Sequence, residues 1–211
     1  MLLLQGKEGT MRLTLLAFFL LIALLTNAQD QLLLLNGKQY YGVSLDTSGV
    51  KIQFDIAKKN GNFKSKFVYR DEVYSITYSD TTEKVFFFPD LYFIDDYTID
   101  NMKLVVMGKK DARYNFKTKW VIPLGIGIGA LSAYFMEGSI YTLFIPIAYT
   151  GLIQIPIVKI QKESISSPDF IGNEFYLEGY DRKARSKRTK HALISSVVGV
   201  AAGLLIYGAT K

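Results

Sequence analysis

The chain has 211 residues, a net charge of +6, and 49% hydrophobic residues against 21% charged ones. It contains no cysteine, which excludes disulfides, zinc-thiolate sites and cysteine nucleophiles, and its single histidine, His191, argues against a histidine-based metal centre. Long apolar runs alternate with basic segments, a pattern that favours contact with anionic lipid headgroups over nucleic acid.

The N-terminal segment has the pattern of a secretory signal peptide. A basic start at Met11-Arg12 precedes the predominantly apolar run Leu13–Leu25, and small and polar residues follow. We expect a signal peptide over residues 1–28, with Met11 as an alternative start and cleavage after Ala28. The mature chain then begins near Gln29. An uncleaved membrane anchor is the competing interpretation.

Residues 29–96 are expected to form a small, mostly antiparallel β-domain of about six strands. Asn36-Gly37 is a strong hairpin signal. Apolar side chains alternate with small or polar ones over Tyr41–Leu45 and again over Val50–Ile56, which is the period of a half-buried strand. Three further short runs lie before residue 89. Such a set closes most economically into a small barrel or a tightly bent sheet.

One run carries a family resemblance. Leu-Asn-Gly-Lys-x-x-x-Gly-Val, from Leu35 to Val43, precedes a turn and an Ile-x-Phe strand. It resembles the opening of Sm-like and SH3-like small barrels. It is also similar to the N-terminal β-domain of uncharacterised exported bacterial membrane proteins with glycine-rich C-terminal transmembrane helices. Small barrels of this kind bind RNA or peptides, so the resemblance implies a fold and no particular function.

Two groups in this region invite a functional interpretation. A basic-aromatic group around one turn could contact nucleic acid, although a charged hairpin tip is the simpler explanation; it contains Lys58, Lys59, Lys64, Lys66, Phe63, Phe67 and Tyr69. An acidic group could ligate calcium, although strand termination and helix capping by Asp96 or Thr98 is the simpler role; it contains Asp90, Asp95, Asp96 and Asp100.

Residues 97–119 are expected to form a basic amphipathic helix over Ile99–Thr118. Its apolar stripe is imperfect, and its C-terminal half is loaded with cations, which suits the helix dipole. The helix runs toward Trp120, an aromatic residue of the type that lies at membrane interfaces. A basic amphipathic helix that leads into a membrane segment is expected to lie along the lipid headgroups.

Residues 120–158 are nearly all apolar, with one charge, Glu137, close to the middle. Each half is about as long as the shortest segments that cross a bilayer, and a charge belongs near the interface. We therefore expect a transmembrane helical hairpin that turns at Met136–Ser139. The alternative is a soluble core, which is disfavoured because neither half has a polar face.

Residues 159–190 are expected to form a basic polar connection, and residues 191–209 a third transmembrane helix. The basic segments before the two apolar regions form a weak repeat, in which Ala112-Arg113 aligns with Ala184-Arg185 and Gly127 with Gly199. Duplication would explain the match, but the shared physics of entering a membrane twice is favoured. The residues expected to contact lipid headgroups are Lys109, Lys110, Arg113, Lys117, Arg182, Lys183, Arg185, Lys187 and Arg188.

Small residues recur every fourth position in both apolar regions, which places them on one helix face and permits close contact between membrane helices. These predicted helix-packing positions are Gly125, Gly129, Ala133, Ser195, Gly199 and Gly203. Neither set matches a phosphate-binding loop, because both lie inside apolar runs with no lysine-serine pair after them.

The sequence as a whole predicts an α+β membrane protein. The favoured function is a non-enzymatic, membrane-anchored cell-envelope protein that presents the β-domain for binding or scaffolding. The alternatives are a small oligomeric channel or transporter subunit and, less favoured, an enzyme that uses the acidic group. No catalytic constellation is recognisable, so no cofactor, metal or small-molecule substrate is expected. The expected partners are the bilayer with its anionic headgroups and a homo-oligomer or a protein bound through the β-domain, but no nucleic acid.

The expected location is the bacterial inner membrane with the β-domain on the periplasmic side. A hairpin over 120–158 then puts the 159–190 segment on that same side and the C-terminus inside. A single crossing would put residues 159–190 inside and the C-terminus outside. An uncleaved, inverted anchor would keep the β-domain cytoplasmic and satisfy the tendency of basic residues to remain inside.

Overall fold

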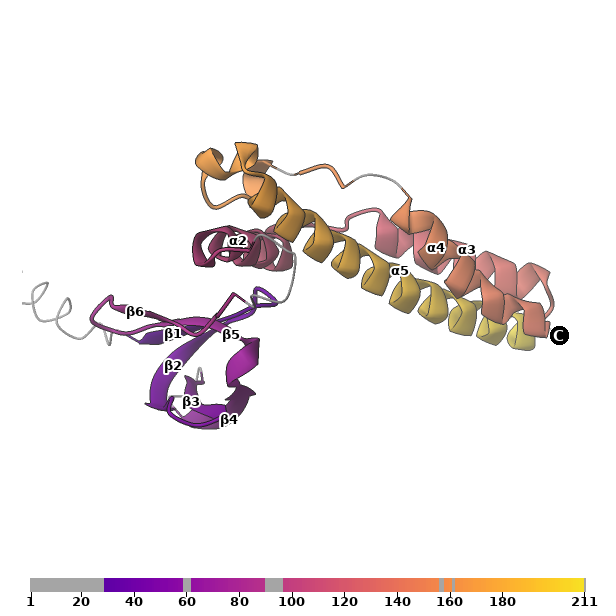
Figure 1. Ribbon diagram of the computed structural model, residues 1–211. Coiled ribbons are helices and arrows are strands. Elements are labelled where there is room, and N and C mark those ends of the chain that lie inside the picture. Colours follow the sequence, from indigo (N-terminus) through magenta and orange to yellow (C-terminus); the bar gives the residue numbers. More distant parts are fainter. Residues whose placement is uncertain (1–28, 59–61, 90–96, 156–157, 161, 211) are drawn as a thin grey trace, which may run out of the picture. The chain divides into compact units, whose positions relative to one another are not determined.

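The computed structural model describes residues 29–58, 62–89, 97–155, 158–160 and 162–210 (Figure 1). Its fold is α+β, with a six-stranded antiparallel sheet followed by four helices, as predicted. The predicted signal peptide lies outside the described residues. So do Lys59 and three of the four carboxylates of the predicted calcium group, Asp90, Asp95 and Asp96.

The strands of the sheet are ordered β4-β3-β2-β1-β5-β6. Their bounds are β1 Asp30–Leu34, β2 Gln39–Asp46, β3 Lys51–Ala57, β4 Phe63–Tyr69, β5 Val73–Thr77 and β6 Glu83–Val85. The predicted Asn36-Gly37 turn joins β1 to β2. Gly37 has a φ of +75°, a backbone conformation that glycine adopts without strain, and the Asn36 side chain accepts a hydrogen bond from the amide of Lys38 at 2.9 Å.

The described chain falls into two compact units. The first contains Tyr40–Arg70, Ile76–Lys84 and the chain up to Leu32. Alternating residues of its strands supply a buried core that includes Ile52, Phe54 and Val68. Gly42 is required here, because a Cβ at this position would lie 1.8 Å from the carbonyl oxygen of Asp55 on the neighbouring strand.

The second unit contains residues 33–39, 71–75 and 85–211, and with them the four α-helices in the described part of the chain. The helices are α2 Ile99–Asn115, α3 Val121–Phe135, α4 Ile145–Gln154 and α5 Glu174–Thr210, with short 3-10 turns η2 Ile140–Phe144, η3 Lys162–Ser164 and η4 Pro168–Gly172. In Figure 1, α5 is accompanied by α2 along its first half and by α3 and α4 along its second half.

Helix α2 begins at the predicted cap, where the Thr98 hydroxyl accepts a hydrogen bond from the amide of Asn101 at 3.2 Å. It ends at Asn115, three residues before the predicted end. Lys187 of α5 explains the early end, because its ammonium group donates to the carbonyl oxygens of Arg113 and Phe116 at 2.8 and 2.7 Å. A side chain from another helix thus caps the last turn of α2.

Helix α2 packs against protein on two faces, and its expected position along lipid headgroups stays a prediction. One face of α2, with Val106 and Met102, packs against Leu33 and Tyr74. Another face contacts the first half of α5 in a cluster that contains Ala112, Tyr176, Tyr180 and Ala184 together with Leu104 and Met107. Both of these faces of α2 are therefore covered by protein.

The segment predicted as a polar connection over 159–190 is helical from Glu174, and it continues without a break into the predicted third membrane helix. The continuous helix α5 has 37 residues. Its charged first half hides a narrow buried face in which Tyr176, Gly179, Tyr180 and Ala184 recur at helical spacing. Acid-base pairs four residues apart, Glu178 with Arg182 and Asp181 with Arg185, support the same helix.

The apolar stretch over 120–158 contains α3, a turn, η2 and α4. The turn lies at the predicted place: Glu137 and Gly138 have φ angles of +51° and +71°, and the amide of Gly138 donates to the carbonyl oxygen of Ala133 at 3.2 Å. Two successive left-handed residues end a helix sharply. Both α3 and α4 contact α5.

Candidate interfacial site

The six predicted helix-packing residues lie where α3 contacts α5. All are buried, and they are Gly125, Gly129, Ala133, Ser195, Gly199 and Gly203. A Cβ on Gly129 would lie 2.3 Å from the carbonyl oxygen of Ser196, and one on Gly199 would lie 2.3 Å from that of Ile126. The two backbones therefore touch, and no side chain fits between them at these positions.

Helices α3 and α5 run parallel. Gly125, near the start of α3, faces Ser195, whereas Gly203, further along α5, faces Ala130 and Ala133. With α3 parallel to α5, the intervening segment must return the chain to the level at which α3 began. The start of α3, at Val121, and Ala192 of α5 therefore lie at the same end of this bundle.

A second pair of glycines makes the equivalent contact between α2 and α5. A Cβ on Gly108 would lie 2.2 Å from the carbonyl oxygen of Tyr176, and one on Gly179 would lie 2.1 Å from that of Val105. These partners are 68 to 74 residues apart in the chain, close to the 72-residue offset of the sequence repeat. The two halves of the repeat thus lie side by side and nearly in register along α5.

The outer surface of the α3, α4 and α5 bundle is apolar. Large side chains with at least half of their surface exposed occur on each element; they include Leu124, Leu131, Phe135, Ile140, Leu143, Ile147, Leu152, Ile194, Val197, Leu205 and Ile206. Residues 121–135, 140–155 and 192–210 contain no Asp, Glu, Lys or Arg. This surface is the reverse of that of a soluble bundle, whose outer faces are polar.

The hydroxyl groups of the same bundle are satisfied locally. Ser132 donates to the carbonyl oxygen of Ile128 at 2.7 Å, Thr150 to that of Pro146 at 2.6 Å, and Ser196 to that of Ala192 at 2.8 Å. The buried Tyr149 hydroxyl of α4 donates to the carbonyl oxygen of Val121 at 2.7 Å. These hydroxyl groups of the bundle therefore find their hydrogen-bond partners within it.

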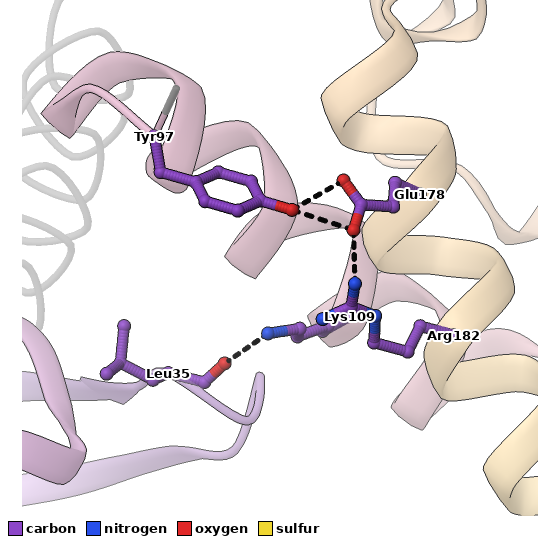
Figure 2. Close-up of polar contacts among 5 residues, drawn as sticks. All are labelled: Leu35, Tyr97, Lys109, Glu178 and Arg182. Carbon is purple, nitrogen blue, oxygen red and sulfur yellow. Dashed lines mark hydrogen bonds and ion pairs between the residues drawn. The ribbon is translucent and has the colours of Figure 1, made fainter. Parts of the chain in front are cut away.

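Outside the apolar bundle, cations gather between α2 and the first half of α5. We call Lys109, Arg113, Lys183 and Lys187 the cationic cluster. Lys109 donates to the carbonyl oxygen of Leu35 at 3.1 Å (Figure 2), and Arg113 donates to that of Asn36 at 3.1 Å. These bonds fasten the 33–39 segment to α2, with Gly37 so close that a Cβ there would lie 2.5 Å from the amide nitrogen of Lys110.

The cationic cluster is electrostatically costly. Burial lowers the pKa of Lys109, and Arg182 lowers it further, while Glu178 opposes this. The pKa of Lys183 is lowered by burial and then by the neighbouring cations, Arg113 first. Burial and Arg113 also lower the pKa of Lys187. Positive charge is therefore concentrated here beyond what the adjacent acids neutralise.

Two of the other predicted headgroup residues make acid-base pairs along α5. Arg182 contacts Glu178, whose carboxylate also accepts from the Tyr97 hydroxyl at 2.8 Å (Figure 2). Arg185 pairs with Asp181 at 2.6 Å and donates to the carbonyl oxygen of Gln154 at 3.1 Å. Lys110 is half-buried on α2. Contact of the predicted set with lipid headgroups stays a prediction.

Lys117 and Arg188 line a cavity of about 490 Å³ at the break between α2 and α3. We call it the interfacial cavity, and its lining residues are Asn115, Phe116, Lys117, Thr118, Lys119, Trp120, Val121, Glu163, Ser164 and Arg188. It lies between the charged first half of α5 and the uncharged second half. The break itself creates it, because the chain leaves the helical path at Phe116 and rejoins it at Val121.

A buried polar group holds the segment before η4 against the helices. Asp111 is 2% exposed, and its carboxylate accepts from the Tyr176 hydroxyl at 2.6 Å, the Ser166 amide at 2.8 Å and the Ser166 hydroxyl. Burial and this carboxylate raise the pKa of Tyr176. The arrangement is a structural anchor, and within the described residues no group of His, Cys, Asp or Glu could hold a metal ion.

Sequence patterns gave little sign of several of these residues. Gly108 and Gly179 stand outside the apolar runs, so the small-residue pattern did not include them. Asp111 looked like one charge among many in a basic helix, although its burial makes it the centre of a hydrogen-bond network. Lys187 belonged to a dense basic run, and only the structure gives it a capping role.

Comparisons of this chain with protein-family models, with curated proteins and with solved structures find no match.

Proposed function

We propose that this chain is a non-enzymatic, membrane-anchored protein of the bacterial cell envelope that presents its six-stranded sheet, called the β-sheet unit below, at the membrane surface for binding or scaffolding. The observation that carries the proposal is the apolar outer surface of the α3, α4 and α5 bundle combined with its small, tightly packed interior. In lipid, close backbone contact at small residues is the usual way for helices to associate.

The lengths of the helices are compatible with this role. The uncharged part of α5 from residue 192 to 209 has the roughly 18–20 residues needed to cross a bilayer, and α5 is long and apolar enough to span one. Helix α3, with 15 residues, extends about 22 Å and is shorter than the hydrocarbon layer. Local thinning of the bilayer and the flanking Trp120 and Lys119 would accommodate the difference.

The parallel arrangement of α3 and α5 supports a hairpin over 120–158, because α4 then returns the chain to the side where α3 begins. The β-sheet unit and the residues before α5 would lie on the same side of the membrane. We favour the periplasmic side, given the signal peptide expected over residues 1–28. The same geometry also suits an inverted arrangement. A single crossing over 120–158, by contrast, would make α3 and α5 antiparallel.

Extraction and topology mapping test the proposal. The full chain should remain in the membrane pellet after alkaline carbonate treatment. Reporter fusions after Lys110, near Glu174 and after Lys211 should read outside, outside and inside. An outside, inside, outside pattern would contradict the hairpin, and an inside, inside, outside pattern would contradict the periplasmic assignment. Release of the protein by carbonate would reject membrane anchoring altogether.

The β-sheet unit offers a surface for the binding role. On the side of β3 and β4 away from the core, Phe63, Phe67 and Tyr69 are each at least half exposed, and Lys51 lies over the Tyr69 ring at 4.9 Å. Aromatic side chains with an adjacent cation are common at protein contacts.

Ion flux through liposomes that contain the purified chain would instead favour a channel or transporter subunit.

A further inference from the structure

The interfacial cavity is not needed for anchoring, yet its position and charge suit a specific ligand. We propose that it binds the phosphate group of an anionic phospholipid headgroup, with Lys119 and Arg188 as the principal cationic contacts. This inference rests on the proposed function, because it requires the cavity to lie at the membrane surface.

The lining of the interfacial cavity is predominantly cationic. The cavity is lined by three cations, Lys117, Lys119 and Arg188, against one acid, Glu163. Arg188 is held there at a cost, because burial lowers its pKa and the nearby Arg185 lowers it further. Guanidinium and ammonium groups are the side chains that bind phosphate oxygens, and arginine does so with two parallel hydrogen bonds.

The cations of the cavity lie next to the uncharged parts of α3 and α5. Lys119 and Trp120 immediately precede α3, and the Trp120 side chain is 78% exposed. Arg188 stands four residues before Ala192, where the uncharged part of α5 begins, a distance of about 6 Å along the helix axis. The cations therefore lie at the level where a tryptophan marks the boundary between headgroups and acyl chains.

Side-chain contacts hold the lining residues of the cavity in place. The Thr118 hydroxyl and His191 Nδ1 are 2.6 Å apart, and the Asn115 side chain donates to the carbonyl oxygen of Ser164 at 3.1 Å. These contacts tie the connection between α2 and α3 to α5 and to η3. A cavity of about 490 Å³ lies within the roughly 300–1,000 Å³ range of small-ligand sites.

A free phosphate would satisfy the same cations, but the surroundings favour a lipid. Ile122 and Leu124 follow directly on α3 and are 42% and 52% exposed. A phospholipid with its phosphate in the cavity could lay its acyl chains along these side chains. Basic pockets beside membrane helices are typical sites for anionic headgroups.

The chain's single tryptophan makes a direct test possible. The purified full-length protein in maltoside micelles would be titrated with brominated phosphatidylglycerol or brominated phosphatidylcholine, and quenching of Trp120 fluorescence measured. We expect saturable quenching at lower mole fraction for phosphatidylglycerol. The K119Q/R188Q variant should raise the phosphatidylglycerol mole fraction needed for half-maximal quenching on the order of tenfold. The matched control K159Q/K162Q removes the same charge from exposed positions outside the cavity and should change it less than twofold.

Because Arg188 is partly buried, K119Q alone provides a second variant at an exposed position, and it should weaken binding several-fold with an unchanged circular dichroism melt. Equal quenching by the two lipids in the wild type, or equal losses in the cavity and control variants, would overturn the proposal. Inorganic phosphate that protects Trp120 from brominated phosphatidylglycerol at millimolar concentration would assign the site to free phosphate instead. If the protein resists carbonate extraction but shows no lipid preference, the cavity proposal fails while membrane anchoring stands.

Discussion

The contact between α3 and α5 makes a quantitative prediction about Gly129. An alanine there would place its Cβ 2.3 Å from the carbonyl oxygen of Ser196 and 2.8 Å from the amide nitrogen of Val200, whereas ordinary contact begins at 3.4 Å. Both neighbours are backbone atoms, so no side chain can rotate away. The helices must separate by about 1 Å, and a gap of that size loses a quarter to a half of the dispersion energy of the contacts around it.

We therefore expect G129A to destabilise the bundle by about 1–3 kcal/mol, the usual cost of overpacking. The matched control is G127A, on the same helix, because a Cβ at Gly127 meets nothing within 4 Å. Both variants gain similar helix propensity, so the difference between them isolates the clash. G199A should behave like G129A, since its Cβ would lie 2.3 Å from the carbonyl oxygen of Ile126.

Unfolding of the purified protein in maltoside micelles, titrated with dodecyl sulfate and followed by circular dichroism, gives the free energies. The reasoning is refuted if G129A and G127A agree to within about 0.5 kcal/mol, which is smaller than the overpacking cost. Leucine at either Gly129 or Gly199 should be worse than alanine. A leucine variant that kept wild-type stability would show that the helices do not meet at these positions.

Two further predictions address the direction of the helices and the buried carboxylate. In this cysteine-free chain, G125C/S195C should oxidise to an intramolecular disulfide, because a Cβ on Gly125 would lie 3.0 Å from that of Ser195 and a slight separation of the helices brings this distance to the about 3.5–4.5 Å of disulfides. G125C/G203C should not oxidise, as thiol labelling after oxidation would show; the opposite pattern would mean antiparallel helices. D111N should lower the free energy of unfolding, measured by heat or denaturant, by about 2–3 kcal/mol, because the carboxylate that accepts three hydrogen bonds is lost. The control is D169N, at an exposed position. Equal stability of the two variants would rule out the anchoring role of Asp111.

The features that could be predicted from sequence were those with a clean local period. The alternation over Val50–Ile56 and the Asn36-Gly37 turn were enough to place strands and a hairpin. The four-residue spacing of Gly125, Gly129 and Ala133 marked the face that touches α5. In each case a single physical requirement, either burial on one side or close backbone approach, acts on every residue of the pattern.

The features that could not be predicted arise where two requirements compete. In the first half of α5, solvent-exposed charges outnumber the buried residues, so composition indicated a loop although Tyr176, Tyr180 and Ala184 keep helical spacing. Helix α2 shows an imperfect stripe because it is buried on two different faces. The interfacial cavity could not be predicted because the run 115–121 meets its other lining residues, Glu163, Ser164 and Arg188, only after folding.

The unbroken length of α5 has a consequence for its rotational phase. Each residue of an α-helix turns the chain by about 100°. The face that meets α2, around Tyr180, and the face that meets α3, around Gly199, are therefore fixed relative to each other by the number of residues between them. One residue inserted near Thr189 would swing the glycines away from α3 while leaving the first half in place. The same insertion between Phe116 and Trp120 would be taken up by the non-helical connection. The number of residues in α5 between its contacts with α2 and α3 is therefore fixed. The connection between α2 and α3, by contrast, can change length without disturbing either helical contact.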